Sequence, residues 1–234
     1  MTDEYAKRAN ASLKGRVDIK VFHSSQLGSD EQMSRGVKVG APEMFLPSTV
    51  MSTIEQKFGV FEMPYIIVSR AHMKKVADNK QVQQSLFEPL PGKGMRILGV
   101  WENGFRHITN NARPIAKPDD LKGIKLRVPG GVWRVKMFKN YGANPSPMPL
   151  AEVYSALQSG VMDGQENPFP QIASAKFQEV QKYLSLSGHV YTPAYLVVGE
   201  DSWKKLPPDI QTTLSKIAWE MGDFARSEGE RLDK

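Results

Sequence analysis

Stretches with a hydrophobic period of two alternate with stretches of helical period along most of this chain. Ile124-Lys-Leu-Arg-Val128 is an example of the first kind, and Pro129-Gly-Gly131 separates it from apolar residues at helical spacing. The alternation predicts an α/β fold, because strands and helices that follow one another pack as separate layers.

Period-two patterns predict strands at 16–22, 43–46, 96–101 and 124–128. Helical patterns predict helices at 29–40, 133–141 and 150–157, and from Pro208 almost to the end of the chain. Ser29 and Gln32 have the spacing of a capping box, and Gly142 and Gly160 follow helical stripes as left-handed caps would.

The charge pattern argues against nucleic acid as a partner. The net charge is +6, yet the basic residues are scattered and no run of them is longer than two. The longest apolar runs, such as 65–68 and 195–198, are far shorter than the roughly 20 residues that a helix needs to cross a bilayer. There is no cysteine, so disulfides and thiolate metal sites are excluded.

Arg127 is the first candidate binding residue, because it lies near the carboxyl end of a predicted strand, where open α/β sheets collect ligands. Its planar guanidinium could hold both oxygens of a carboxylate. On the residues alone, an exposed arginine on the polar face of an amphipathic strand is the favoured alternative.

Asn167 is the second candidate, in Asp163-Gly-Gln-Glu-Asn167-Pro168. Pro168 biases it toward an extended backbone, and its amide could donate to a ligand oxygen and accept from a ligand hydroxyl. A turn asparagine that bonds its own backbone is the alternative. Arg106 offers a further cation, with a solvated surface arginine as its alternative.

Enzymatic interpretations have weaker support. Asp163 and Glu166 could form an acid/base pair, but no histidine, serine nucleophile or phosphate loop joins them. The four histidines lack metal-ligand spacing, and Gly123, Gly130 and Gly131 do not form a dinucleotide-binding motif. The residues thus imply neither metal nor cofactor.

Several motifs in order resemble the solute-binding proteins of tripartite ATP-independent periplasmic (TRAP) transporters, of the dicarboxylate-binding (DctP) type. The resemblance extends over most of the chain. Its motifs include Phe58-Gly-Val-Phe-Glu-Met-Pro64, Trp101-Glu-Asn-Gly-Phe-Arg-His107, Pro118-Asp-Asp-Leu-Lys-Gly-Ile-Lys-Leu-Arg-Val-Pro129 and Asp163-Gly-Gln-Glu-Asn-Pro168.

The resemblance implies a two-lobed periplasmic-binding-protein fold, similar to type II, with a hinge and a ligand cleft between the lobes. Lobe I would comprise 1–103 and 193–234, and lobe II would comprise 104–192. Family chains usually begin with a signal peptide and a first strand, and they continue beyond the position of Lys234. From the resemblance we expect an internal fragment, which lacks both ends, of a periplasmic protein.

The resemblance also implies roles for single residues. Arg127 would pair with the ligand carboxylate, Asn167 would help to hold it, and Arg106 would be a second ligand-contacting arginine. Polar contacts are expected from Ser48 and Thr49, and pocket walls from Trp133, Leu150 and Tyr191.

The function that follows is capture of a small organic acid, without catalysis, and delivery to the membrane permease subunits of a TRAP transporter. A monomer is expected. A ligand-sensing domain of a signalling receptor and a hydrolase acting on an organic acid are the alternatives. The residues leave the identity of the acid open.

Overall fold

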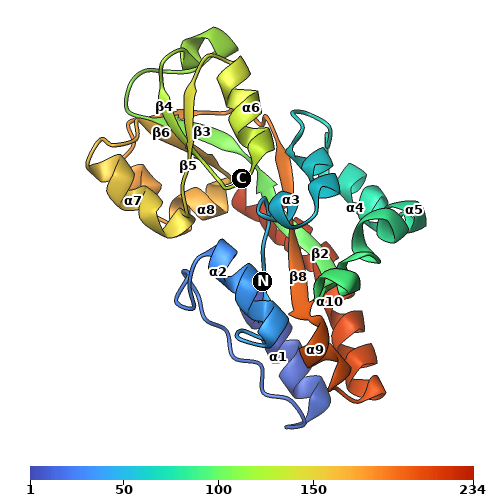
Figure 1. The fold of residues 1–234 in the computed structure, drawn as a ribbon. Coiled ribbons are helices and arrows are strands. Elements are labelled where there is room, and N and C mark those ends of the chain that lie inside the picture. Colours follow the sequence, from blue (N-terminus) through green and yellow to red (C-terminus); the bar gives the residue numbers. More distant parts are fainter. The chain divides into compact units, whose positions relative to one another are not determined.

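The computed structural model describes residues 1–234, which form two compact units (Figure 1). Unit 1 contains 1–48, 70–102 and 193–230, and unit 2 contains 49–69, 103–192 and 231–234. Compared with the lobes predicted from the sequence, residues 49–69, 103 and 231–234 lie in the other unit. For 49–69 the reason is side-chain packing, since Gly59 lies against the Trp133 indole and Glu62 pairs with Arg134.

Unit 1 combines a small sheet with several helices. Its strands are β1 (Met44–Phe45), most of β2 (Met95–Phe105) and most of β8 (Tyr191–Gly199). Its α-helices are α1 (Thr2–Leu13), α2 (Asp30–Gly36), α4 (Arg70–Asp78), α5 (Lys80–Val82), α9 (Glu200–Lys204) and most of α10 (Pro208–Leu232). Shorter helical turns are η1 (Val37–Val39), η3 (Gln83–Phe87) and η4 (Leu90–Lys93).

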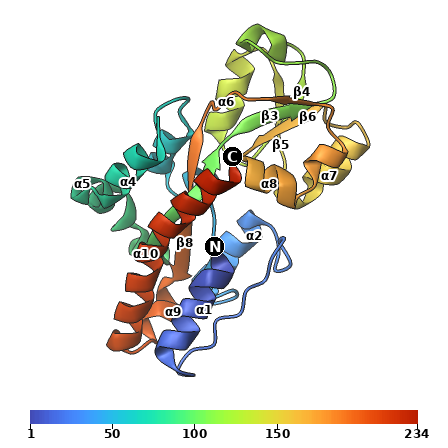
Figure 2. The ribbon, with the colours of Figure 1, turned by 180° about the vertical axis from the view of Figure 1, so that it is seen from behind.

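The sheet of unit 1 has the strand order β1-β8-β2, and α10 runs alongside β2 and β8 (Figures 1 and 2). Leu214, Ala218 and Met221 on the apolar stripe of α10 are buried in the same cluster as Leu98 and Trp101 of β2. The 25 residues of α10 make it the longest helix, yet neither it nor any other helix has an apolar stretch long enough to cross a membrane.

Unit 2 is built around a larger sheet. Its strands are β3 (His107–Asn110), β4 (Lys125–Val128), β5 (Asn144–Pro147), β6 (Gly164–Asn167) and β7 (Tyr183–Ser185). Its α-helices are α3 (Met51–Ile54), α6 (Val132–Asn140), α7 (Leu150–Gln158) and α8 (Phe169–Ser174). Its 3-10 helices are η2 (Gln56–Glu62), η5 (Pro118–Leu121) and η6 (Phe177–Glu179).

The strands of unit 2 follow the order β5-β4-β6-β3-β7. β4 runs parallel to β5 and β6, whereas β3 is antiparallel to β6 and β7. Helix α6 lies on one side of this sheet and helices α7 and α8 lie on the other (Figures 1 and 2). Alternate residues of each strand therefore point to different helical layers.

Most predicted elements are confirmed, and with them the α/β class. Ser29 and Gln32 form the predicted capping box, and Gly142 and Gly160 have the positive φ angles, 83° and 74°, expected just after helices α6 and α7. The strand predicted at 16–22 is wrong, because this segment has no strand neighbour.

The 16–22 segment alternates because it packs on a core without joining a sheet. Val17 and Ile19 cover the cluster around Trp101. The Asn10 side chain accepts from Ile19 N at 2.8 Å and donates to Ile19 O at 3.1 Å, as a neighbouring strand would. One side-chain amide thus replaces the ladder that the alternation predicted.

Candidate functional site

Arg127 lies on β4 with its side chain on the α7 and α8 side of the unit 2 sheet. Its neighbours Leu126 and Val128 are fully buried in the apolar cluster that includes α6, so alternation along the strand turns Arg127 the other way. The residue is only 3% exposed. Its Nε and Nη2 atoms donate to Met148 O at 2.9 and 2.6 Å, which fixes the plane of the guanidinium.

Asn167 is the last residue of β6, on the strand next to β4. Arg127 is aligned with Gln165, and Asn167 lies two residues beyond Gln165, so Arg127 and Asn167 project from the same face of adjacent strands. Asn167 is 4% exposed, and its Nδ2 donates to Gln165 Oε1 at 2.6 Å. Pro168 follows with extended backbone and begins the approach to α8.

The structure therefore brings the two leading candidates together. Both are desolvated, both are held by protein hydrogen bonds, and both lie at the carboxyl end of their strand. A desolvated guanidinium beside an amide can bind a carboxylate, because charge-assisted hydrogen bonds strengthen where water is excluded.

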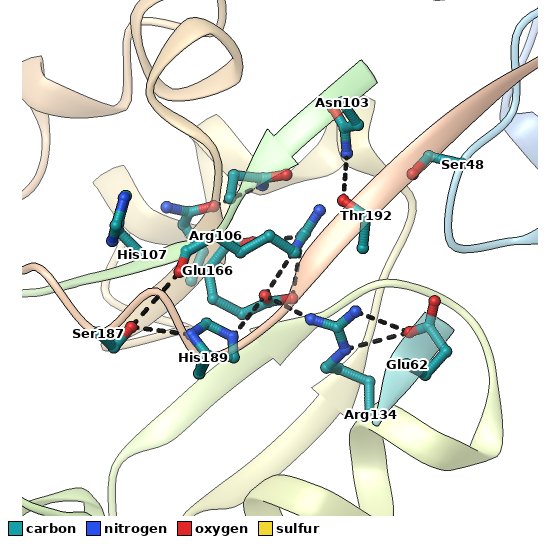
Figure 3. A network of polar contacts seen from close by, with 12 residues as sticks. Ser48, Glu62, Asn103, Arg106, His107, Arg134, Glu166, Ser187, His189 and Thr192 are labelled. Carbon is teal, nitrogen blue, oxygen red and sulfur yellow. Dashed lines mark hydrogen bonds and ion pairs between the residues drawn. The ribbon is translucent and has the colours of Figure 1, made fainter. Parts of the chain in front are cut away.

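The opposite face of β6 carries a buried charged network around Glu166 (Figure 3). Arg106 donates from Nε and Nη2 to the Glu166 carboxylate at 2.5 and 3.0 Å, and Arg134 Nη1 donates to it at 2.8 Å. His189 Nε2 lies 3.0 Å from the same carboxylate. Arg134 reaches from Glu166 to Glu62, to which it donates from Nη2 at 2.7 Å.

Burial and charge set the protonation of this network. Burial alone would raise the pKa of Glu166, but the charges of Arg106 and Arg134 and the hydrogen bond of His189 outweigh it and hold that pKa well below its ordinary value. For Glu62, burial outweighs the attraction of Arg134 and raises the pKa. Burial also lowers the pKa of His189, despite the carboxylate beside it.

Arg106, the second predicted ligand arginine, is a central member of this network. Besides its two bonds to the Glu166 carboxylate, its Nη2 donates to Glu166 O at 2.6 Å. The residue is 2% exposed. Its geometry is that of a group that holds β6 in place, and direct contact between Arg106 and a ligand stays a prediction.

The other candidates have varied surroundings. The Thr49 hydroxyl and the Trp133 indole nitrogen are buried without a hydrogen-bond partner. The Ser48 hydroxyl donates to Pro193 O at 2.7 Å within unit 1. Leu150 opens α7 and packs on its apolar cluster, and the Tyr191 ring meets Phe105 edge-on at 4.9 Å. Their ligand roles stay predictions.

Sequence reasoning missed Glu62, Arg134 and His189 as members of a network. Arg134 had a detectable signal, because it precedes Met137 and Phe138 by three and four residues and so shares the buried face of α6. Glu62 and His189 had none, since their partners are 72 and 23 residues away in the chain.

The carboxylates considered as an acid/base pair bind different partners. Asp163 Oδ2 accepts from Lys125 N at 2.8 Å, whereas Glu166 is held by two arginines and a histidine. A carboxylate whose pKa is held low by two cations is a weak base. Both groups therefore act in the architecture of unit 2.

Comparisons with known proteins agree with this architecture. Residues 1–234 match the family described as bacterial extracellular solute-binding protein, family 7 (DctP). This chain belongs to family 7. A relative from Escherichia coli (strain K12), the 2,3-diketo-L-gulonate-binding periplasmic protein YiaO, is 38% identical over 226 residues, which cover 94% of this chain and 69% of YiaO.

Solved structures of family 7 relatives have the same fold. The sugar acid binding protein DctPAm from Advenella mimigardefordensis, in complex with galactonate, has a TM-score of 0.95 at 35% identity, covering 99% of this chain and 74% of DctPAm. A TRAP periplasmic solute binding protein from Polaromonas sp JS666, bound to D-erythronate, has a TM-score of 0.93 at 32% identity, covering 99% of this chain and 76% of the Polaromonas protein. The fold predicted from the motifs, that of the TRAP solute-binding proteins, is confirmed.

Proposed function

We propose that this chain is a periplasmic solute-binding protein that captures a small organic acid through its carboxylate and delivers it to the permease of a TRAP transporter. Family 7 consists of solute-binding proteins, which bind and release their ligands unchanged. Relatives of this chain are named for binding 2,3-diketo-L-gulonate or were solved with galactonate or D-erythronate, and all three are carboxylates.

The observation that carries the proposal is the pairing of Arg127 with Asn167 on one face of β4 and β6. Arg127 would hold the ligand carboxylate, and Asn167 would add a hydrogen bond. Thr49 supports a site in unit 2, because its hydroxyl is buried without a protein partner, and such a group lowers stability unless something binds it.

Calorimetry on the Arg127→Ala and Arg127→Lys variants tests the proposal, with galactonate and D-erythronate as ligands. A charge-assisted bond contributes about 1.5–3 kcal/mol and an unpaired buried carboxylate costs more, so we expect Arg127→Ala to weaken binding at least about thirtyfold. Arg127→Lys should recover part of the loss, because lysine cannot bind both oxygens at once.

Arg35 on α2 is exposed, and Arg35→Ala is the matched control that should bind as the wild type does. Folded Arg127→Ala protein with wild-type affinity would exclude the carboxylate assignment. The ligand should also be recovered intact after long incubation with the protein, whereas turnover would favour an enzyme.

A further inference from the structure

A chain of four polar side chains crosses the Arg127 face of the unit 2 sheet and ends at Asn167. On the antiparallel strands β3 and β6, Thr109 is opposite Gln165 and His107 is opposite Asn167. Thr109, Gln165 and Asn167 therefore point to the same face of the sheet. Thr109 is 3% exposed, Gln165 is fully buried and Asn167 is 4% exposed. Gln181, which precedes β7, completes the chain at its other end.

Gln181 determines the direction of every hydrogen bond in this series of four side chains. Its Nε2 faces Val180 O at 3.1 Å and Asp163 O at 3.4 Å. Backbone carbonyls can only accept, so the nitrogen must be on that side and Oε1 must face the hydroxyl of Thr109, 2.9 Å away. Oε1 in turn can only accept, and therefore the Thr109 hydroxyl donates its proton to Gln181.

The donor and acceptor roles at Thr109 then determine those of Gln165 and Asn167. Because the Thr109 proton is used, the Thr109 oxygen accepts from Gln165 Nε2 at 2.9 Å. Gln165 therefore presents Oε1 to Asn167, whose Nδ2 donates to it at 2.6 Å. A flipped Asn167 amide would place two carbonyl oxygens in contact in a buried site, and both would lose a hydrogen bond.

One orientation of the Asn167 amide follows. Its nitrogen faces Gln165, and its Oδ1 faces away, as an acceptor. Neighbouring strands lie about 4.8 Å apart and two residues of a strand span about 6.6 Å, so a ligand whose carboxylate meets Arg127 reaches Asn167 with its first few carbon atoms. An acceptor in that position binds a hydroxyl and offers nothing to a methylene.

We propose that Gln181, Thr109 and Gln165 are positioning residues that fix Oδ1 of Asn167 as an acceptor for a ligand hydroxyl, which makes the site selective for acids hydroxylated beside the carboxylate. This inference rests on the proposed function. The inference narrows the ligand class from carboxylates in general to 2-hydroxy acids, and it assigns selectivity to residues that do not touch the ligand.

The test compares matched acids that differ by one hydroxyl, namely D-erythronate with 3,4-dihydroxybutanoate and L-malate with succinate. Calorimetry on the wild type should give at least about tenfold tighter binding of the hydroxylated member of each pair that binds. Thr109→Val has the same shape without the hydroxyl, and it should bring that ratio close to one. Thr109→Ser keeps the hydroxyl and should keep the ratio.

Gln181→Met, at a partly exposed position, breaks the first link and should act like Thr109→Val, so a folding defect in one variant leaves the other to decide. Selectivity that persists in either folded variant, or a wild-type affinity ratio near one, would overturn the proposal that these residues position the Asn167 amide. If Arg127→Ala still loses affinity in that case, the proposed function stands. A wild type that binds none of the four acids would overturn this inference, and galactonate binding that is lost in Arg127→Ala would show that the proposed function still stands.

Discussion

Arg134 and Glu62 are joined by two hydrogen bonds although 72 residues separate them, and the side chains are 0% and 4% exposed. The same guanidinium bonds Glu166, so one arginine links η2, helix α6 and strand β6. Unit 2 thus holds segment 49–69 through a charge that has no access to water.

Arg134→Met should strongly destabilise the protein. Methionine fills similar volume but leaves Glu62 without its arginine and Glu166 with one arginine fewer, and breaking a buried pair in this way costs about 3–5 kcal/mol. Urea denaturation measures the change in the free energy of unfolding. The exposed Arg35→Met is the control and should stay within about 0.5 kcal/mol of the wild type. Equal effects of the two substitutions would contradict a stabilising role for the network.

Gly99→Ala should separate α10 from β2. A Cβ at Gly99 would lie 2.3 Å from Ala218 O, and overpacking of this kind costs about 1–3 kcal/mol. Gly92→Ala is the matched control, since a Cβ there meets nothing within 4 Å. Thermal melting of the two variants checks the difference, and a Gly99→Ala melting temperature equal to that of Gly92→Ala would refute the close approach.

Thr49→Val should leave stability unchanged or slightly raised while it weakens ligand binding. The Thr49 hydroxyl has no protein partner, so its removal breaks no bond in the folded protein. Ser52→Ala is the contrast, because the Ser52 hydroxyl donates to Thr49 O at 3.1 Å and its loss should cost about 1 kcal/mol. Denaturation and calorimetry on both variants separate the two roles. Undiminished ligand affinity in Thr49→Val would remove Thr49 from the site.

The contribution of His189 to the free energy of unfolding should fall as the pH drops from 7 to 5. Burial lowers the pKa of His189 below 6.5, so under acid conditions the unfolded chain takes up a proton before the folded protein does. The stabilisation is complete above about pH 6.5 and is lost as the pH falls toward the folded pKa. His189 faces Glu166, Ser187 and the Phe138 ring, with the charges of Arg106 and Arg134 nearby.

His189→Gln should flatten this dependence in urea titrations at pH 7, 6 and 5. Burial lowers the pKa of His107 as well, so His107 contributes in the same direction and the double variant should be flatter still. An unchanged slope in His189→Gln would show that the loss of stability arises elsewhere.

The sequence predicted those parts of the fold that local patterns determine. The stripe of α10 and the cap after α6 depend on residues within one helix, and both are confirmed. Segment 16–22 shows the limit, because its alternation is real but its backbone partner is the side chain of Asn10, which no periodicity reveals.

The candidate site divides in the same way. Arg127 and Asn167 could be named because each lies at the end of a strand and matches a family motif. The hydrogen bonds that link Gln181 and Thr109 to Asn167 could not be predicted, because they depend on the register of β3 against β6 and on the face to which each side chain points. Pairing between distant strands is set by the whole sheet, so a single sequence carries little local signal for it.

The strand order of unit 1 has a consequence for the order in which the two sheets can form as the chain emerges. β8 lies between β1 and β2 but is the last of the three in the chain. β1 and β2 therefore lack their common neighbour, and keep unpaired edges, until the chain has emerged as far as residue 199. The last strand of the unit 2 sheet already ends at Ser185. A chain that emerges amino terminus first can therefore complete the unit 2 sheet first, and the unit 1 strands are the segments that need protection from aggregation.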